Sequence, residues 1–202
     1  MLMVIVIIGI LAVTAINVPH LVSSTRKSSA LQELLATMEA ARGRALRNNG
    51  LVYLAFSGPK AGGSLEPLRQ YAILDYDETA ASSATRFKLV TPWQKLPEGY
   101  VFVNSNVSTG TVSTNLLSFQ NAAQDVPGDG QNTSTVLAQC LAFGSLGQVI
   151  FPEGAIGTLQ IPIAEGIVQS DIIVTRKGSQ PTASDCYYIE VRRNTGRAFL
   201  LP

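Results

Sequence analysis

Side chains that commonly do chemistry are sparse in this chain of 202 residues. The single histidine, His20, rules out a His-based catalytic triad or a two-histidine metal site built from this chain alone. Two glycine-rich segments come close to functional motifs. Gly58 and Gly63-Ser64 have the spacing of a phosphate-binding loop but no lysine between Gly63 and Ser64, and Gly144 to Gly147 is one residue too short for a nucleophile elbow. The sequence therefore predicts a protein that is not an enzyme and uses no cofactor.

Carboxylates gather at two places: Asp75, Asp77 and Glu78 at the end of a predicted strand, and Asp125 and Asp129 around a turn. Calcium prefers six to eight oxygen ligands, so two carboxylates would need several carbonyl groups beside them. Asp125 and Asp129 are a weak calcium candidate. A solvated turn is the simpler interpretation.

The two cysteines, Cys140 and Cys186, are too few for a zinc ribbon or a disulfide-rich scaffold. If their strands are neighbours, they are a candidate disulfide, which would stabilise the fold by about 4 kcal/mol in the chain-entropy model. Two buried free thiols are the alternative.

Three arginines, Arg192, Arg193 and Arg197, gather in the last predicted hairpin. The chain as a whole has a net charge of +1 and only 14% charged residues, so it lacks the basic excess of a nucleic-acid binder. Phosphate binding needs several clustered charges, and a solvated hairpin is the simpler interpretation.

The element that must position these residues begins at the N-terminus. Residues 1–18 are almost entirely apolar, and no charged side chain precedes Arg26. A bilayer core is spanned by about 20 helical residues, so a membrane helix is the favoured interpretation. A signal-peptide remnant and a buried core helix are the alternatives, but the run lacks a basic leader and its apolar surface is continuous.

After Pro19 the helical pattern continues with a different surface. Apolar residues recur at helical spacing in one narrow stripe, for which we expect packing on the rest of the domain: Leu31, Leu34, Leu35, Met38 and Leu46. Asn48 to Gly50 ends the helix, with Gly50 expected in the left-handed conformation. The sequence predicts one helix with a lipid-facing first half and an amphipathic second half.

Beyond Gly50 the pattern is that of β-structure. Strands are expected at 51–56, 69–76, 86–90, 100–103, 135–143, 148–151, 157–163 and 171–175, and a hairpin at 186–201. Residues 104–135 read as a long, partly irregular insertion with a short helix near 116–122. No helical run is long enough to connect parallel strands, so the sequence predicts an α+β protein with a mainly antiparallel sheet.

These residues carry a family resemblance. Val4 to Ala12 resembles the N-terminal segment of type IV pilins and type II secretion pseudopilins. Leu34 to Val52 resembles the GspH/FimT minor-pilin subgroup, in which a helix end of the pattern AR-x-x-A-x-x-x-N leads directly into the first strand. Leu96 to Gly99 before a strand and the Asn-x-Gly-Arg hairpin are similar to the same group. The pilin-like proteins of the Verru-Chthon gene cassettes are a related possibility.

The resemblance implies a pilin-like fold, with a transmembrane half-helix (1–22), an amphipathic half-helix (23–50) and a periplasmic β-rich domain (51–202). It implies a non-enzymatic minor pseudopilin or prepilin-like subunit of a type II secretion or type IV pilus filament. The implied partners are other pilins, inner-membrane lipid and an inner-membrane assembly platform, with the chain crossing the inner membrane once. The residues expected to form the membrane and filament-core surface are Met1, Val4, Ile5, Ile8, Gly9, Ala12 and Pro19.

An alternative within the family is a FimT-like minor pilin that binds DNA for uptake through Arg192, Arg193 and Arg197. The second arginine of that C-terminal pattern is missing here, and the tail from Leu200 to Pro202 is apolar. Nucleic acid is therefore not the expected partner.

Family members carry a basic leader ending in Gly, then Phe and a few residues ending in Glu, before the apolar run. This sequence begins where the residue after that Glu would lie. We expect a misplaced start or a trimmed sequence, because Met1 would be internal in the longer protein. If the chain does begin at Met1, processing by a peptidase and assembly guided by Glu would not apply.

Overall fold

The computed structural model describes residues 29–59, 65–80, 83–104, 113–118, 123–128, 135–153, 158–169, 172–175, 178 and 180–201. The chain divides into two compact units, Met1–Leu34 and Leu35–Pro202. The predicted membrane half, residues 1–22, lies outside the described residues, and so does His20. Within the described ranges, no helix is both long enough and apolar enough to cross a bilayer.

A helix over residues 29–48 (the 29–48 helix) leads into the first strand. It ends where the sequence predicts, but the left-handed residue is Asn49, with φ of 49°, and not Gly50. The Gly50 N–H donates to the Ala45 carbonyl at 3.3 Å, which is the six-to-one bond of a Schellman cap. Asparagine takes this position because it tolerates left-handed backbone better than most side chains. The prediction of Gly50 as the left-handed cap was therefore wrong by one residue.

Among the described residues, the first sheet has seven strands, and every pairing in it is antiparallel. Its order is β3-β2-β1-β8-β7, with β4 on β2 and β9 on β8. The strands are β1 (Val52–Ser57), β2 (Gln70–Tyr76), β3 (Phe87–Leu89), β4 (Gln94–Lys95), β7 (Ala123–Pro127), β8 (Thr135–Phe143) and β9 (Val149–Phe151). Central β1 is buried along its whole length, so both faces of this sheet are covered.

One face of the first sheet has a core of its own. Tyr53 of β1 packs edge-on to Phe87 of β3, with ring centroids 5.1 Å apart, among small residues of β8 such as Ala138 and Ala142. The edge strands β3 and β7 contact each other, and the short helix α2 (Ser83–Arg86) also contacts β7. The Trp93 Nε1–H donates to the carbonyls of Pro127 and Gly128 at 3.2 and 3.1 Å. The sheet is therefore curled so that its two edges meet.

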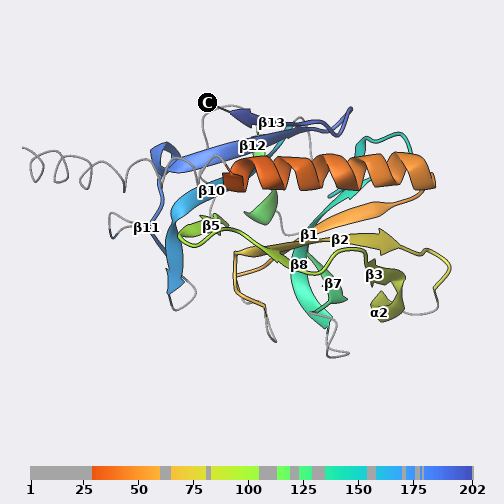
Figure 1. The fold of residues 1–202 in the computed structure, drawn as a ribbon, viewed down its shortest axis with the longest axis horizontal. Coiled ribbons are helices and arrows are strands. Elements are labelled where there is room, and N and C mark those ends of the chain that lie inside the picture. Colours follow the sequence, from red (N-terminus) through yellow and green to blue (C-terminus); the bar gives the residue numbers. More distant parts are fainter. Residues whose placement is uncertain are drawn as a thin grey trace, which may run out of the picture. The chain divides into compact units, whose positions relative to one another are not determined.

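In the part of the chain that the structure describes, the second sheet has six strands in the order β11-β10-β12-β13, with β5 and β6 also paired to β10. The strands are β5 (Tyr100–Phe102), β6 (Ser113–Asn115), β10 (Thr158–Gln169), β11 (Ile172–Thr175), β12 (Cys186–Arg192) and β13 (Ala198–Leu201). Phe102 packs edge-on against Phe56 and Tyr71 of the first sheet, at centroid distances of 5.2 and 6.3 Å. The inner faces of the two sheets therefore share a core (Figure 1).

The α+β prediction is confirmed, with helix and mainly antiparallel sheets in the described chain. One pairing departs from it, because β6 runs parallel to β10. No long helix is needed for this pair, since the intervening chain passes through β7, β8 and β9 of the other sheet. The predicted insertion 104–135 contains β6, a 3-10 helix (Leu116–Ser118) and β7. A second 3-10 helix, Ala183–Asp185, precedes β12.

Candidate assembly joint and arginine hairpin

The packing stripe predicted on the helix divides by burial. Leu31, Leu34 and Met38 are buried, and Leu35 is half-buried. Leu46 is 43% exposed, and it lies over the turn at Gly147, where a Cβ would meet its side chain at 3.3 Å. Leu46 therefore covers a turn of the β domain at the rim of the stripe.

Arg44 ties the helix to the first sheet. Its Nε and Nη2 donate to Oδ1 and Oδ2 of Asp75 on β2, both at 2.6 Å. The two planar groups meet in the two-pronged geometry that only arginine can offer a carboxylate. The hydrogen bond from this pair raises the pKa of Arg44 above its ordinary value. Asp75, which the sequence placed in an acidic group, is thus a structural partner of the helix.

Arg42 ties the same helix to the second sheet. Its Nε donates to the Thr195 carbonyl at 2.7 Å, and its Nη1 pairs with Glu39 at 3.3 Å. Thr195 lies in the turn between β12 and β13, 153 residues further along the chain. Nothing in the sequence pattern pointed to this contact.

The two turns under Arg42 touch each other through their backbones. A Cβ at Gly196 would lie 2.0 Å from the Gly147 carbonyl oxygen, and φ at Gly196 is +63°. Only glycine fits such an approach and such a φ. Nearby, the Val149 N–H donates to the Arg193 carbonyl at 2.8 Å. We call this meeting of the 29–48 helix (at Arg42 and Leu46), the 144–147 turn and the 193–196 turn the assembly joint.

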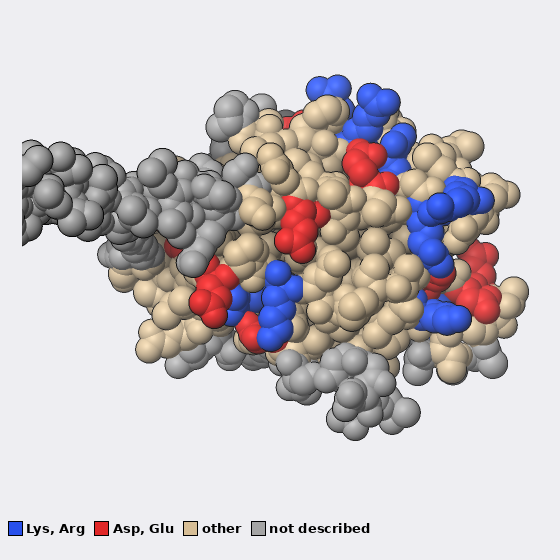
Figure 2. Space-filling view, in the orientation of Figure 1, with Lys and Arg blue, Asp and Glu red and all other residues tan. Residues whose placement is uncertain are grey.

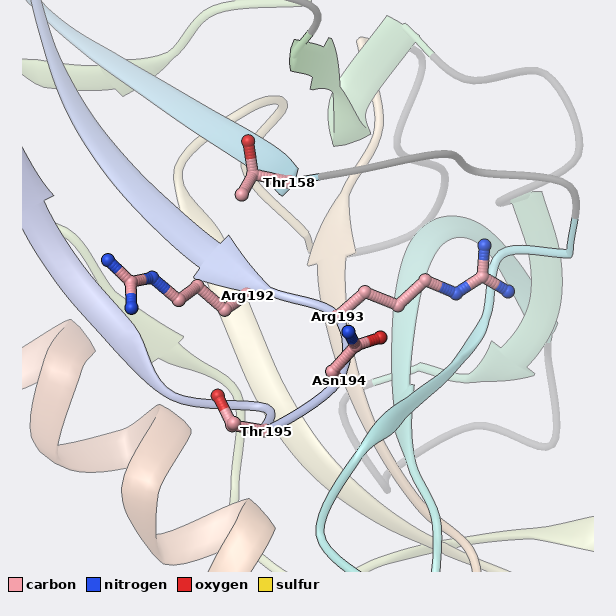
Figure 3. Close-up of a pocket in the computed structure, with 5 residues that line it drawn as sticks. All are labelled: Thr158, Arg192, Arg193, Asn194 and Thr195. Atoms are coloured by element: carbon pink, nitrogen blue, oxygen red, sulfur yellow. The ribbon is translucent and has the colours of Figure 1, made fainter.

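The arginine hairpin, β12 to β13, carries Arg192, Arg193 and Arg197. Arg192 is exposed and its guanidinium lies 4.9 Å from the centroid of the Phe199 ring. Arg193 is half-buried, and Figure 3 shows its side chain pointing away from that of Arg192. A hollow of about 450 Å³ is lined by Thr158, Arg192, Arg193, Asn194 and Thr195. Arg192 and Arg193 line this hollow without converging on one point, and Arg197 is not among its lining residues.

Charge is unevenly spread over the face in Figure 2. Lys and Arg side chains gather along the rim that overlies the end of the helix and the β12–β13 hairpin, with acidic side chains beside them. Of the 15 Lys and Arg in the chain, Arg42, Arg44, Arg47, Arg192, Arg193 and Arg197 belong to these two segments. Arg42 and Arg44 are already paired with Glu39 and Asp75, which leaves a moderate positive surface.

The two cysteines are free thiols in separate sheets, so the candidate disulfide is not formed. Cys140 is fully buried on β8, and burial raises the pKa of its thiol well above the ordinary range. Cys186 begins β12, donates to the Thr182 carbonyl at 3.4 Å, and has a pKa raised by burial to about 11.

The calcium candidate is only half described. Asp125 is exposed on β7, and Asp129 lies outside the described residues. In the part of the chain that the structure describes, no three His, Cys, Asp or Glu side chains gather as metal ligands. Asp77, in the other acidic group, accepts hydrogen bonds from the backbone and hydroxyl of Thr79.

Glu66 forms ion pairs that the sequence pattern did not predict. Glu66 accepts from Arg69 and from Lys95, each at 2.6 Å. The hydrogen bond from Lys95 lowers the pKa of Glu66, and the charges of Arg69 and Lys95 act in the same direction. Only the i,i+3 spacing of Glu66 and Arg69 is a sequence signal.

The sequence matches no family model, and no curated protein matches it. Solved structures give weak likenesses. The type IV minor pilin FimU of Pseudomonas aeruginosa PAO1 is 12% identical, with 87% of this chain and 92% of that chain covered and a TM-score of 0.43. The minor pseudopilin EpsH from the Type 2 Secretion System of Vibrio cholerae is 13% identical, with 87% and 94% covered and a TM-score of 0.43.

Proposed function

We propose that this chain is a non-enzymatic structural subunit, a minor pseudopilin or prepilin-like protein, of a type II secretion or type IV pilus filament. Residues 1–22 hold it in the inner membrane before assembly, and the β domain lies in the periplasm. The observation that carries the proposal is the helix end. The sequence has an uncharged apolar run over residues 1–18, and the helix described over residues 29–48 is fastened to both sheets by Arg42 and Arg44.

This division of the helix suits a subunit that changes its surroundings. The apolar half leaves lipid and packs against the same segment of other subunits, so it exchanges one apolar contact for another. Small residues such as Gly9 and Ala12 allow helices to approach closely. Helix residues from Leu35 onward belong to the same compact unit as the β domain, and Arg42 and Arg44 fasten them to it. The partners are therefore other pilins and the membrane platform that extracts subunits.

The test uses the full chain in its native cell, with two readouts. Alkaline extraction of membranes reports anchoring, and shearing of surface or periplasmic filaments reports assembly. Gly9→Trp should leave the chain in the membrane and remove it from the filament fraction, because a large side chain blocks close helix packing. Leu11→Trp is the matched control, because the side chain at this position is already large in the wild type. Release of the wild-type chain at alkaline pH would refute the anchor, and its absence from filaments would refute the subunit role.

A second candidate function is DNA capture by Arg192, Arg193 and Arg197. The observation in its favour is the hollow lined by Arg192 and Arg193, together with the exposure of Arg192 and Arg197. Retention on double-stranded DNA should then fall with salt by a slope of about 0.9 per phosphate contacted. Loss of binding in the triple alanine variant, with Arg86→Ala as control, would support it. No binding at low salt would exclude it.

A further inference from the structure

The β10–β11 hairpin carries an exposed apolar face that the fold leaves uncovered. In its register, Ile167 is opposite Val174 and Gln169 is opposite Ile172. These four side chains point to the same face because alternate residues of a strand share a side. Ile167 is 57% exposed, Ile172 is 49% exposed and Val174 is half-buried. The other face is inward, with Ile173 and Thr175 buried.

This hairpin lies at one particular end of the domain. On β12, Arg192 pairs with Thr158 and Cys186 pairs with Ala164, so β10 extends beyond the Cys186 end. Ile167 is nine residues from Thr158, which is about 30 Å along a strand. The 193–196 turn, at the other end of β12, is where Arg42 and Leu46 of the helix lie. The β10–β11 hairpin is therefore at the end of the domain away from the 193–196 turn. In Figure 1 the described helix, taken from residue 35 on, begins on the same side as β11 and runs toward the tip of the β12–β13 hairpin.

A groove beside the apolar face contains a cationic side chain, Arg69. It has a volume of about 210 Å³ and is lined by Glu66, Pro67, Arg69, Gly99, Ile167 and Val168. Arg69 pairs with Glu66, and Lys95 pairs with the same carboxylate, so these three groups together carry one net positive charge. The Arg69 Nε is buried and, among the described residues, has no hydrogen-bond acceptor. Because this nitrogen is buried, an anionic group outside would be attracted by the net positive charge of the groove and not by a hydrogen bond to Nε.

We propose that the face of Ile167, Ile172 and Val174 rests in the interface of the bilayer before assembly, with the Arg69 groove against anionic lipid headgroups. The inference rests on the proposed membrane anchor. Twelve residues separate residue 22, the end of the predicted membrane half, from Leu35, the first of the domain unit. Even fully extended, twelve residues reach at most about 40 Å, which limits the distance between the domain and the lipid surface.

The chemistry of the face favours lipid over water. Amphipathic surfaces bind membranes through apolar side chains at the acyl boundary, and basic groups add attraction to anionic lipid. From Gly166 to Gln169 and from Ile172 to Thr175 neither strand carries a charged residue. The first charge on the same face of β10 is Glu165, which accepts a hydrogen bond from the Tyr100 hydroxyl at 3.3 Å. Beyond Glu165, Ile163 on the same face is fully buried in the domain, so the exposed apolar part of this face is confined to the hairpin.

The test uses the full chain in vesicles of phosphatidylcholine with and without phosphatidylglycerol, in a Cys186→Ser background. An environment-sensitive dye on Ile167→Cys should show blue-shifted emission and quenching by spin-labelled lipid, more strongly with the anionic lipid. Leu146→Cys is the matched control, since Leu146 is 79% exposed at the opposite end and should show neither effect. Ile172→Cys is a second reporter, which must agree with the first in a chain whose circular dichroism is unchanged.

The outcomes separate this inference from the function on which it rests. A water-like signal at 167 and 172, while the chain resists alkaline extraction, overturns the hairpin contact and leaves the anchor. Release of the chain by alkali overturns the anchor itself. A blue shift without quenching by spin-labelled lipid, lost when the protein is diluted in lipid, would assign the face to another subunit and would overturn the bilayer contact.

Discussion

Arg44 and Asp75 form a two-pronged ion pair that joins the 29–48 helix to β2, with both N–O distances at 2.6 Å. Each side chain keeps 32% of its surface exposed, so water screens the pair. The ion pair therefore contributes more to orientation than to stability, because its two parallel hydrogen bonds fix the rotation of the helix over the sheet.

Arg44→Met should lower the free energy of unfolding by about 1 kcal/mol, since half-exposed ion pairs contribute little more. Arg44→Lys should recover only part of that loss, because a lysine cannot make two parallel hydrogen bonds. Urea denaturation of the single variants and of the double variant with Asp75→Asn measures the coupling. Fully additive losses would show that the pair contributes nothing to stability.

Gly196→Ala should destabilise the chain by about 3 kcal/mol, which combines left-handed strain with overpacking. The physical reason is the 2.0 Å approach of the new Cβ to the Gly147 oxygen. Gly99→Ala is the matched control. Gly99 also has positive φ, at +84°, but no atom lies within 4 Å of its Cβ position. Gly99→Ala should lower the free energy of unfolding by only about 1 kcal/mol. Equal losses for the two variants in thermal unfolding would contradict the close contact at Gly196.

Met38→Ala should cost about 2 to 4 kcal/mol, since Met38 is 1% exposed and its removal leaves a cavity. Leu46→Ala should cost less than about 1 kcal/mol, because the side chain is already 43% exposed. Both lie on the stripe predicted from sequence, so the comparison separates buried positions from the rim. Chemical denaturation gives both values, and a larger loss at Leu46 would contradict the burial pattern.

The thiols should react in a fixed order. At pH 8, Cys186 should react slowly with a disulfide reagent, and its rate should rise as pH approaches its pKa of about 11, because only the thiolate attacks. Cys140 should react only after unfolding, since it is completely buried. Two thiols should be titrated in denaturant without reductant. A count of zero would establish the disulfide instead.

Glu66 should contribute stability that depends on pH. Its pKa in the folded chain is lowered from 4.5, mainly by the hydrogen bond from Lys95. The contribution is therefore complete above pH 4.5 and is lost as pH falls through the lower folded value. The difference in stability between the wild type and Glu66→Gln should be constant near neutrality and shrink in acid. A difference that grows in acid would mean that folding raises the pKa of Glu66 and does not lower it.

Much of the fold could be predicted because its strands are short, apolar and bounded by turn residues. The strand expected at 135–143 is β8 itself, and the expected hairpin at 186–201 is β12 and β13. Periodicity gave no sign that the strands form two sheets, since pairing partners such as β1 and β8 are far apart in sequence. The length of β10 was also missed, because Pro162 and Gly166 interrupt its pattern.

The site was harder to predict than the fold. Helical spacing was enough to place Met38 in the packing stripe, since local geometry fixes which residues share a face. The partners of Arg42 and Arg44 depend on where distant turns and strands arrive in space. The arginine hairpin was visible as a charge cluster, but not its contact with the helix through Thr195.

The backbone contact between Gly196 and Gly147 has a mechanical consequence. Side chains can bend and change rotamer under load, whereas two turns in direct backbone contact cannot slide without breaking the Val149–Arg193 hydrogen bond. Arg42 holds the same turn from the helix side. A partner that pulls on the C-terminal hairpin therefore pulls on the helix through a stiff path. Force applied at one edge of the domain is delivered to the segment that leads toward the N-terminus.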